Sequence, residues 1–170
     1  MAPKRHFLSN AYEYFNTLTM VFYLMVSVPL LFFIIVYLSY QEEGGLQPTQ
    51  RMNVVEHVLL PAAIIISLVM PFVMYRRQLQ ARRPMDGFRA KLRTFHQLSF
   101  YRYGWLTLAN FLAVLGMYYT GEQLFAGLYA IALVVFSLHR PTASRIIKDT
   151  KLNEQEKEWL RSDKNFDELP

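Results

Sequence analysis

Glu56 and His57 are the one adjacent ionisable pair inside an apolar segment of this sequence. A carboxylic acid and an imidazole in apolar surroundings can exchange protons near neutral pH, and ionisable residues in a membrane segment often line an ion or proton path. Asn110 lies near the middle of another apolar segment, where its amide can hydrogen-bond across helices. Together, Glu56, His57 and Asn110 form a candidate polar or ion site.

A simpler interpretation of these residues stays open. Glu56 and His57 lie just inside the end of their segment, where water and lipid head groups at the outer surface can reach them. Consecutive helical residues also point about 100° apart, so the two side chains need not share a partner. Asn110 would then serve only to link neighbouring helices.

A second kind of chemistry lies between the apolar segments. Residues 75–102 contain eight of the 18 Lys and Arg residues and one acidic residue, Asp86. Basic residues beside a membrane span attract the anionic head groups of the cytoplasmic leaflet. The residues predicted to contact anionic lipid are Arg76, Arg77, Arg82, Arg83, Arg89, Lys91 and Arg93.

Several other chemistries are not expected. The chain has no cysteine, which excludes disulfides, thiolate catalysis, iron–sulfur clusters and cysteine-bound zinc. The sequence has no glycine-rich phosphate loop, no G-x-S-x-G motif and no HExxH motif. His96 and His139 have no third ligand at a recognisable spacing for a metal. We therefore expect no enzyme activity, no cofactor, no metal and no nucleic-acid partner.

Four apolar segments must position the candidate residues, at about 17–40, 54–75, 103–119 and 122–138. The first two are long enough to cross a hydrocarbon core of about 30 Å as helices, and the last two are near the lower limit. The sequence therefore predicts an all-α integral membrane protein with four transmembrane helices in two antiparallel hairpins. The alternative for 103–138 is a re-entrant hairpin.

The remaining segments are expected on the cytoplasmic side. Phe88, Leu92 and Phe95 recur at helical spacing and predict an amphipathic interfacial helix at about 87–100. Residues 1–140 would form the transmembrane domain and 141–170 a charged, helical tail. In the tail, Asn153 and Glu156 have the spacing of a capping box at a helix start.

Small residues indicate how the last two spans pack. Ala109, Ala113 and Gly116 recur at helical spacing on one span, and Ala126 and Ala130 on the next. Small side chains allow membrane helices to approach closely. We expect these two helices to form a tight antiparallel pair through these faces.

The positive charges indicate the orientation. With four crossings and both ends cytoplasmic, every Lys and Arg except Arg51 lies on one side of the membrane. Short loops and this strong bias favour a bacterial inner membrane, and an organellar membrane is the alternative. The sequence predicts a structural, accessory or assembly subunit of a membrane complex, or a homo-oligomer. The alternative is a small oligomeric transporter or channel that uses Glu56, His57 and Asn110.

Overall fold

The computed structural model describes residues 11–42, 54–81 and 87–161, and within these ranges the chain is helical without a β-strand. The helices are α1 (Ala11–Glu42), α2 (Val54–Ala81), α3 (Phe88–Thr120), α4 (Gln123–Leu138), α5 (Ala143–Thr150) and α6 (Glu154–Arg161). The predicted all-helical class is confirmed for this part of the chain.

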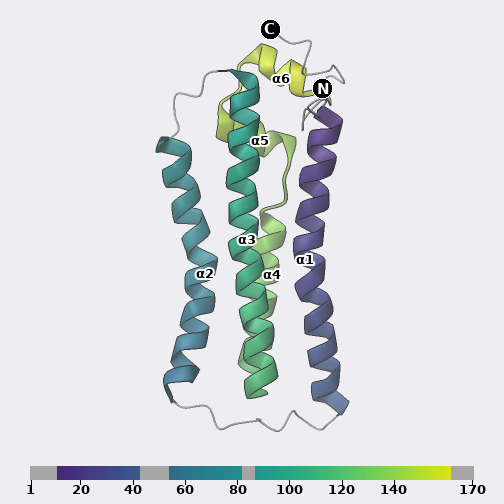
Figure 1. Cartoon of the computed structure of the whole chain (residues 1–170), viewed down its shortest axis with the longest axis vertical. Coiled ribbons are helices and arrows are strands. Elements are labelled where there is room, and N and C mark those ends of the chain that lie inside the picture. Colours follow the sequence, from purple (N-terminus) through teal and green to yellow (C-terminus); the bar gives the residue numbers. More distant parts are fainter. Residues whose placement is uncertain (1–10, 43–53, 82–86, 162–170) are drawn as a thin grey trace, which may run out of the picture.

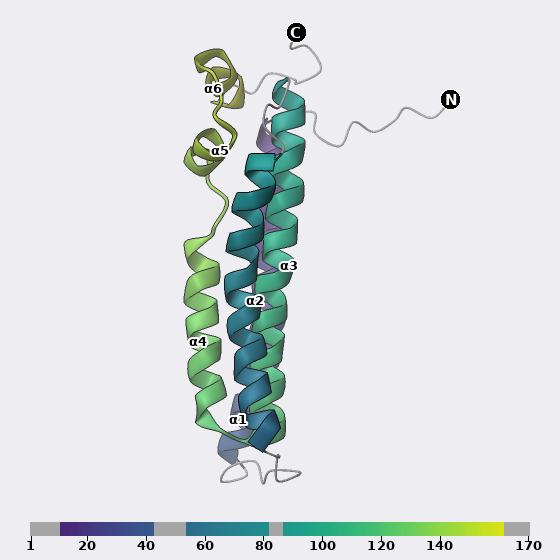
Figure 2. The same cartoon turned by 90° about the vertical axis from the view of Figure 1, so that its left-hand side faces the viewer.

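The helices form an elongated antiparallel bundle around α3 (Figure 1). α1, α2 and α4 pack along α3, and α5 packs on its first part. α1 begins, α2 ends and α3 begins at one end of the bundle, where α5 and α6 also lie (Figure 2). We call this the capped end. α4 runs beside the part of α3 that is farther from it.

Along one face of α3, buried residues recur alternately four and three positions apart over the whole length of the helix. Its members are Phe88, Leu92, Phe95, Ser99, Arg102, Leu106, Ala109, Ala113, Gly116 and Thr120. A repeat that averages 3.5 residues keeps one face of a helix turned toward its neighbours, and no proline interrupts this stretch. α3 is therefore one continuous helix, and the structure does not show the separate interfacial helix predicted at 87–100.

Two helices of the described chain are long and apolar enough to cross a membrane, Tyr12–Glu42 in α1 and His57–Gln80 in α2. α4 and α5 together would give a third span, but they are bent by 76° at their junction. α3 is less apolar, because its first part is charged and its second part contains Asn110. These properties indicate a membrane protein with two or three apolar spans, and four spans stay a prediction.

α1 presents a long apolar face to its surroundings. Its exposed side chains include Leu24, Leu31, Phe32, Ile34, Ile35 and Leu38. Soluble proteins rarely expose contiguous apolar patches of this extent. An exposed apolar face of this length agrees with α1 as a membrane span.

A tight turn joins α3 to α4. Gly121 lies in the left-handed region at φ 64°, and its N–H donates to the Met117 carbonyl at 2.9 Å. This arrangement is a common way to end a helix. Before the turn, a Cβ atom at Gly116 would lie 2.3 Å from the ring of Phe125. Gly116 therefore provides the space that the Phe125 ring occupies.

The packing of α4 on α3 differs in part from the expectation. Ala109, Ala113 and Gly116 are buried, as predicted. On α4 the buried residues are Phe125, Tyr129, Ala132 and Phe136. Ala130 is exposed, so the prediction for this residue was wrong. At Gly116, a small residue of α3 gives space to a large aromatic side chain of α4, the ring of Phe125.

A buried ion pair fixes α6 to α3 at the capped end. Lys91 Nζ lies 2.7 and 2.8 Å from the two carboxylate oxygens of Glu156, and the side chains are 14% and 10% exposed. The same carboxylate accepts a hydrogen bond from the backbone N–H of Asn153 at 2.8 Å. This bond is one half of the predicted capping box.

Replacing Gly116 with alanine should loosen α4. The added methyl group meets the Phe125 ring, and overpacking of this kind destabilises by about 1–3 kcal/mol. Gly104→Ala is the matched control on the same helix, because nothing lies within 4 Å of its added Cβ. Thermal unfolding in mild detergent should show a lower Tm for Gly116→Ala alone. Equal melting of the two variants would contradict the close approach.

Lys91→Met should release α6 from α3. The change leaves the buried Glu156 carboxylate without its cation, and breaking a buried ion pair in this way costs about 3–5 kcal/mol. We expect faster proteolysis between α5 and α6, measured by limited digestion and mass spectrometry. The double variant Lys91→Met/Glu156→Gln removes the unpaired charge and keeps an acceptor for Asn153, so it should recover much of the protection. A single variant as resistant as the parent would show that the ion pair does not hold α6.

Candidate functional site

The structure does not bring the three residues of the sequence-predicted polar site together. His57 Nδ1 lies 3.2 Å from the Glu122 carboxylate near the start of α4, and both side chains are about two-fifths exposed. Asn110 lies ten residues before the end of α3 at Thr120, which is about 15 Å along the helix axis at 1.5 Å per residue. Its Nδ2 donates to the Leu106 carbonyl at 2.8 Å, one turn away on α3. The side chain of Glu56 is outside the described part of the chain.

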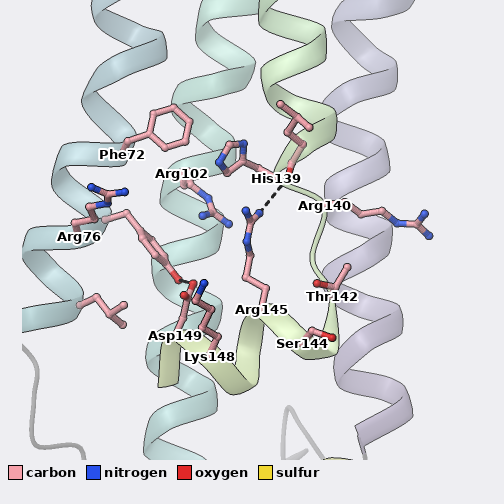
Figure 3. A pocket seen from close by; sticks show the side chains of 13 residues that line it. Phe72, Arg76, Arg102, His139, Arg140, Thr142, Ser144, Arg145, Lys148 and Asp149 are labelled. Atoms are coloured by element: carbon pink, nitrogen blue, oxygen red, sulfur yellow. Dashed lines mark hydrogen bonds between the residues drawn. The ribbon is translucent and has the colours of Figure 1, made fainter. Parts of the chain in front are cut away.

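A different group of residues surrounds a cavity of about 640 Å³ near the capped end. The wall combines the last turns of α2, the middle of α3, the end of α4 and the helix α5 (Figure 3). Its cationic members are Arg76, Arg102, Arg140, Arg145 and Lys148. Among the described residues that line it, Asp149 is the acidic one. The cavity therefore has a strong excess of positive charge.

Arg102 lies at the base of this cavity, on the buried face of α3. Its side chain is 3% exposed. Within the described residues, its Nε and Nη2 atoms are buried and have no hydrogen-bond partner. The guanidinium stands 4.6 Å from the centre of the Tyr75 ring and 5.5 Å from that of Tyr103. These cation–π contacts attract the charge but do not satisfy the N–H groups.

Arg145 reaches the same space from α5. Figure 3 shows the head groups of Arg102 and Arg145 pointing into the middle of the cavity, whereas Arg76 and Arg140 lie at opposite rims. Nη1 of Arg145 donates to the Leu138 carbonyl at 3.3 Å, where α4 ends. The Arg140 guanidinium lies 5.7 Å from the centre of the Tyr23 ring of α1. The two inner arginines thus come from different helices and converge on one space.

The neighbouring polar groups hold this wall in place. The Tyr75 hydroxyl donates a hydrogen bond to the Asp149 carboxylate and so links α2 to α5. His139 Nδ1 lies 2.7 Å from the Val135 carbonyl. Because a carbonyl only accepts, Nδ1 carries the hydrogen, and the Nε2 atom is left as the second polar atom of the ring. The His139 ring also packs against Phe72 of α2, with 4.6 Å between ring centres.

The residues predicted to contact anionic lipid have different environments. Arg76 lines the cavity, and Arg77 and Arg93 are exposed. Lys91 is engaged by Glu156 inside the capped end. Arg89 is exposed and takes part in a further interaction. Arg82 and Arg83 lie outside the described residues.

Sequence reasoning did not identify the cavity. Arg102 belongs to the basic stretch 75–102 but was not among the residues predicted to contact lipid. Arg145 and Lys148 were placed in the charged tail, and Arg140 was given no role. One signal was present, because Arg102 is in phase with the apolar repeat of α3. A charged residue on an otherwise apolar stripe predicts a buried cation. The position of α5 beside it had no local signal.

The comparisons give no relative from which a site can be transferred. No protein-family model, no curated protein and no solved structure matches this chain. The described residues include no group of three or more His, Cys, Asp or Glu side chains that could hold a metal ion.

Arg102→Met should stabilise the protein in the absence of anions. Methionine is shorter than arginine but keeps an unbranched apolar stem without the charge, and replacing buried charges with apolar side chains is often stabilising by about 1–4 kcal/mol. Lys91→Met serves as the contrasting variant, since that cation is paired. In mild detergent with only dilute chloride, the Tm should rise for Arg102→Met and fall for Lys91→Met. A marked fall for both would mean that Arg102 has a structural role.

Proposed function

We propose that this protein is a non-enzymatic integral membrane subunit that binds a phosphate-type anion in its basic cavity, on the cytoplasmic side of the membrane. The observation that carries the proposal is the pair of unpartnered, buried nitrogen atoms of Arg102. Buried donors without an acceptor destabilise a protein by about 1–3 kcal/mol each. An anion in the cavity would supply the missing acceptors.

Phosphate oxygens fit this arrangement best. A guanidinium presents its donors in a planar fork that matches two oxygens of a phosphate group. Arg102 and Arg145 bring two such forks to one space from different helices. A tetrahedral group can contact both at once, because its oxygens point in several directions. A planar carboxylate can form two parallel hydrogen bonds with only one guanidinium at a time.

The proposed topology places the cavity at the inner membrane surface. We retain four spans, at about 17–40, 54–75, 103–119 and 122–138, with both ends cytoplasmic in a bacterial inner membrane. Residues 103–120 of α3 rise about 27 Å, close to the thickness of a hydrocarbon core of about 30 Å. Arg102 then lies at the inner boundary, and the capped end projects into the cytoplasm.

A structural or accessory role agrees with these features. The exposed apolar faces of α1 and α2 can contact lipid, other membrane subunits or further copies of the chain. The alternative was a transporter or channel that uses Glu56, His57 and Asn110. No specific observation favours it, because His57 and Asn110 have separate partners at different depths.

Anion binding can be tested on the purified protein in neutral detergent. Pyrophosphate should raise the Tm of the parent more than chloride does at matched ionic strength. Arg102→Met should weaken pyrophosphate binding by about tenfold or more, since a charge-assisted hydrogen bond contributes about 1.5–3 kcal/mol. Arg77→Met is the matched control, as this exposed arginine of α2 does not line the cavity. Equal responses of the parent and Arg102→Met would refute the proposal.

A further inference from the structure

We infer that the natural ligand of the cavity is a membrane lipid with a doubly charged phosphate head group, which enters sideways between α2 and α4. The inference rests on the proposed anion site and goes further by naming the class of ligand and its route. A phosphomonoester or diphosphate lipid has this chemistry. A soluble phosphate compound is the competing source of the same group.

The cavity has an apolar side wall in addition to the cationic residues at its bottom. Phe72 and Leu79 of α2 and Leu138 of α4 line it together with the cations. Leu138 is 69% exposed although it belongs to the wall. An exposed wall residue marks an opening, and this one lies at the end of a predicted membrane span. A site for a soluble anion needs no apolar side at this place.

The bend after α4 leaves Leu138 exposed on this side, next to the contact between the His139 and Phe72 rings. α4 ends at Leu138, and the chain turns by 76° into α5. α5 therefore runs across the capped end instead of continuing beside α2 (Figure 2). Exposed apolar side chains continue along both helices away from the capped end, Val69 on α2 and Val134 on α4 among them. Acyl chains can lie against these surfaces while the head group reaches the arginines.

The depth of the charges agrees with a lipid head group. Arg102 lies about 27 Å from the far end of α3, at the level where a bilayer core of about 30 Å gives way to head groups. On the water side, the exposed residues Thr142, Ser144 and Lys148 border the cavity. Their polar groups can contact the parts of a head group that face the cytoplasm.

The number of cations favours a doubly charged group. Arg102 and Arg145 point inward, and Arg76, Arg140 and Lys148 stand around the rim. The acidic residue on the wall, Asp149, already accepts a hydrogen bond from Tyr75. A phosphodiester carries one negative charge and has two free oxygens, so it can form a two-oxygen contact with the guanidinium of one arginine. A phosphomonoester has three free oxygens and close to two charges, and can be shared by both arginines.

The test compares two lipids and one soluble anion. Parent protein in nanodiscs of phosphatidylcholine receives either phosphatidic acid, a phosphomonoester, or phosphatidylglycerol, a phosphodiester. Native mass spectrometry measures the bound lipid, and pyrophosphate binding is measured in lipid-free detergent. We expect about tenfold preference for phosphatidic acid, because the second arginine adds charge-assisted hydrogen bonds. Arg102→Met should abolish this preference.

A substitution at the opening separates the route from the charge. Leu138→Asn makes the apolar side polar and should weaken phosphatidic acid binding while pyrophosphate binding stays unchanged. Ile131→Asn is the matched control, since this residue of α4 is also exposed but lies outside the cavity wall. Equal lipid binding by these two variants would overturn the lateral route.

The remaining outcomes distinguish the two proposals. Parent protein that binds pyrophosphate through Arg102 but retains the two lipids equally would overturn the lipid inference and leave the anion site in place. Anion and lipid binding that does not change in Arg102→Met would overturn both. The preference of the parent is measured without any variant, so the inference can fail even where a substitution disturbs folding.

Discussion

The uninterrupted repeat along the buried face of α3 is the constraint on which the other helices depend. Because buried residues recur every three or four positions from Phe88 to Thr120, one face of the helix stays turned inward over its full length. α1, α2, α4 and α5 all pack against α3. The small residues near its end admit the aromatic side chains of α4, and the middle position of the repeat is Arg102. Because Arg102 is part of this repeat, its guanidinium lies in the interior of the helix bundle.

Two buried cations on this helix have opposite environments. Lys91 is held by Glu156 on both carboxylate oxygens, which joins two helices and leaves the ammonium neutralised. Arg102 has aromatic rings beside it and two donors without acceptors. Proteins commonly retain such destabilising arrangements where a ligand completes them, since stability and function are selected together. Within one helix, Lys91 is thus paired by a carboxylate of the fold, whereas Arg102 keeps two nitrogen atoms without an acceptor.

The sequence predicted the features that depend on local or periodic properties. The apolar segments predicted the long helices α1 and α2, and the capping residues predicted the start of α6. The interfacial helix was predicted as a separate element, because its charged exposed face obscured a buried face that continues in phase into the next segment. Ala130 was placed in the α3–α4 interface by residue size alone, whereas the buried face of α4 consists mainly of aromatic residues.

The candidate site was less accessible to prediction, for a physical reason. Its wall depends on the direction in which the chain turns after α4, and no local pattern specifies that direction. His57 likewise meets Glu122, a residue far away in the sequence. Ionisable residues inside apolar segments were the expected location of function. The basic cavity instead combines Arg102 from the packing repeat with Arg140 and Arg145 from the chain that follows α4.

The 76° bend between α4 and α5 has a consequence for how the protein matures. Chains are synthesised from the amino end, and α5 emerges only after every apolar span has left the ribosome. Arg145, Lys148 and Asp149 all belong to α5, so the wall of the cavity is incomplete until this helix has been synthesised. The proposed anion site is therefore absent from a nascent chain that lacks α5. The order of synthesis makes the basic cavity a property of a chain that has been synthesised through α5.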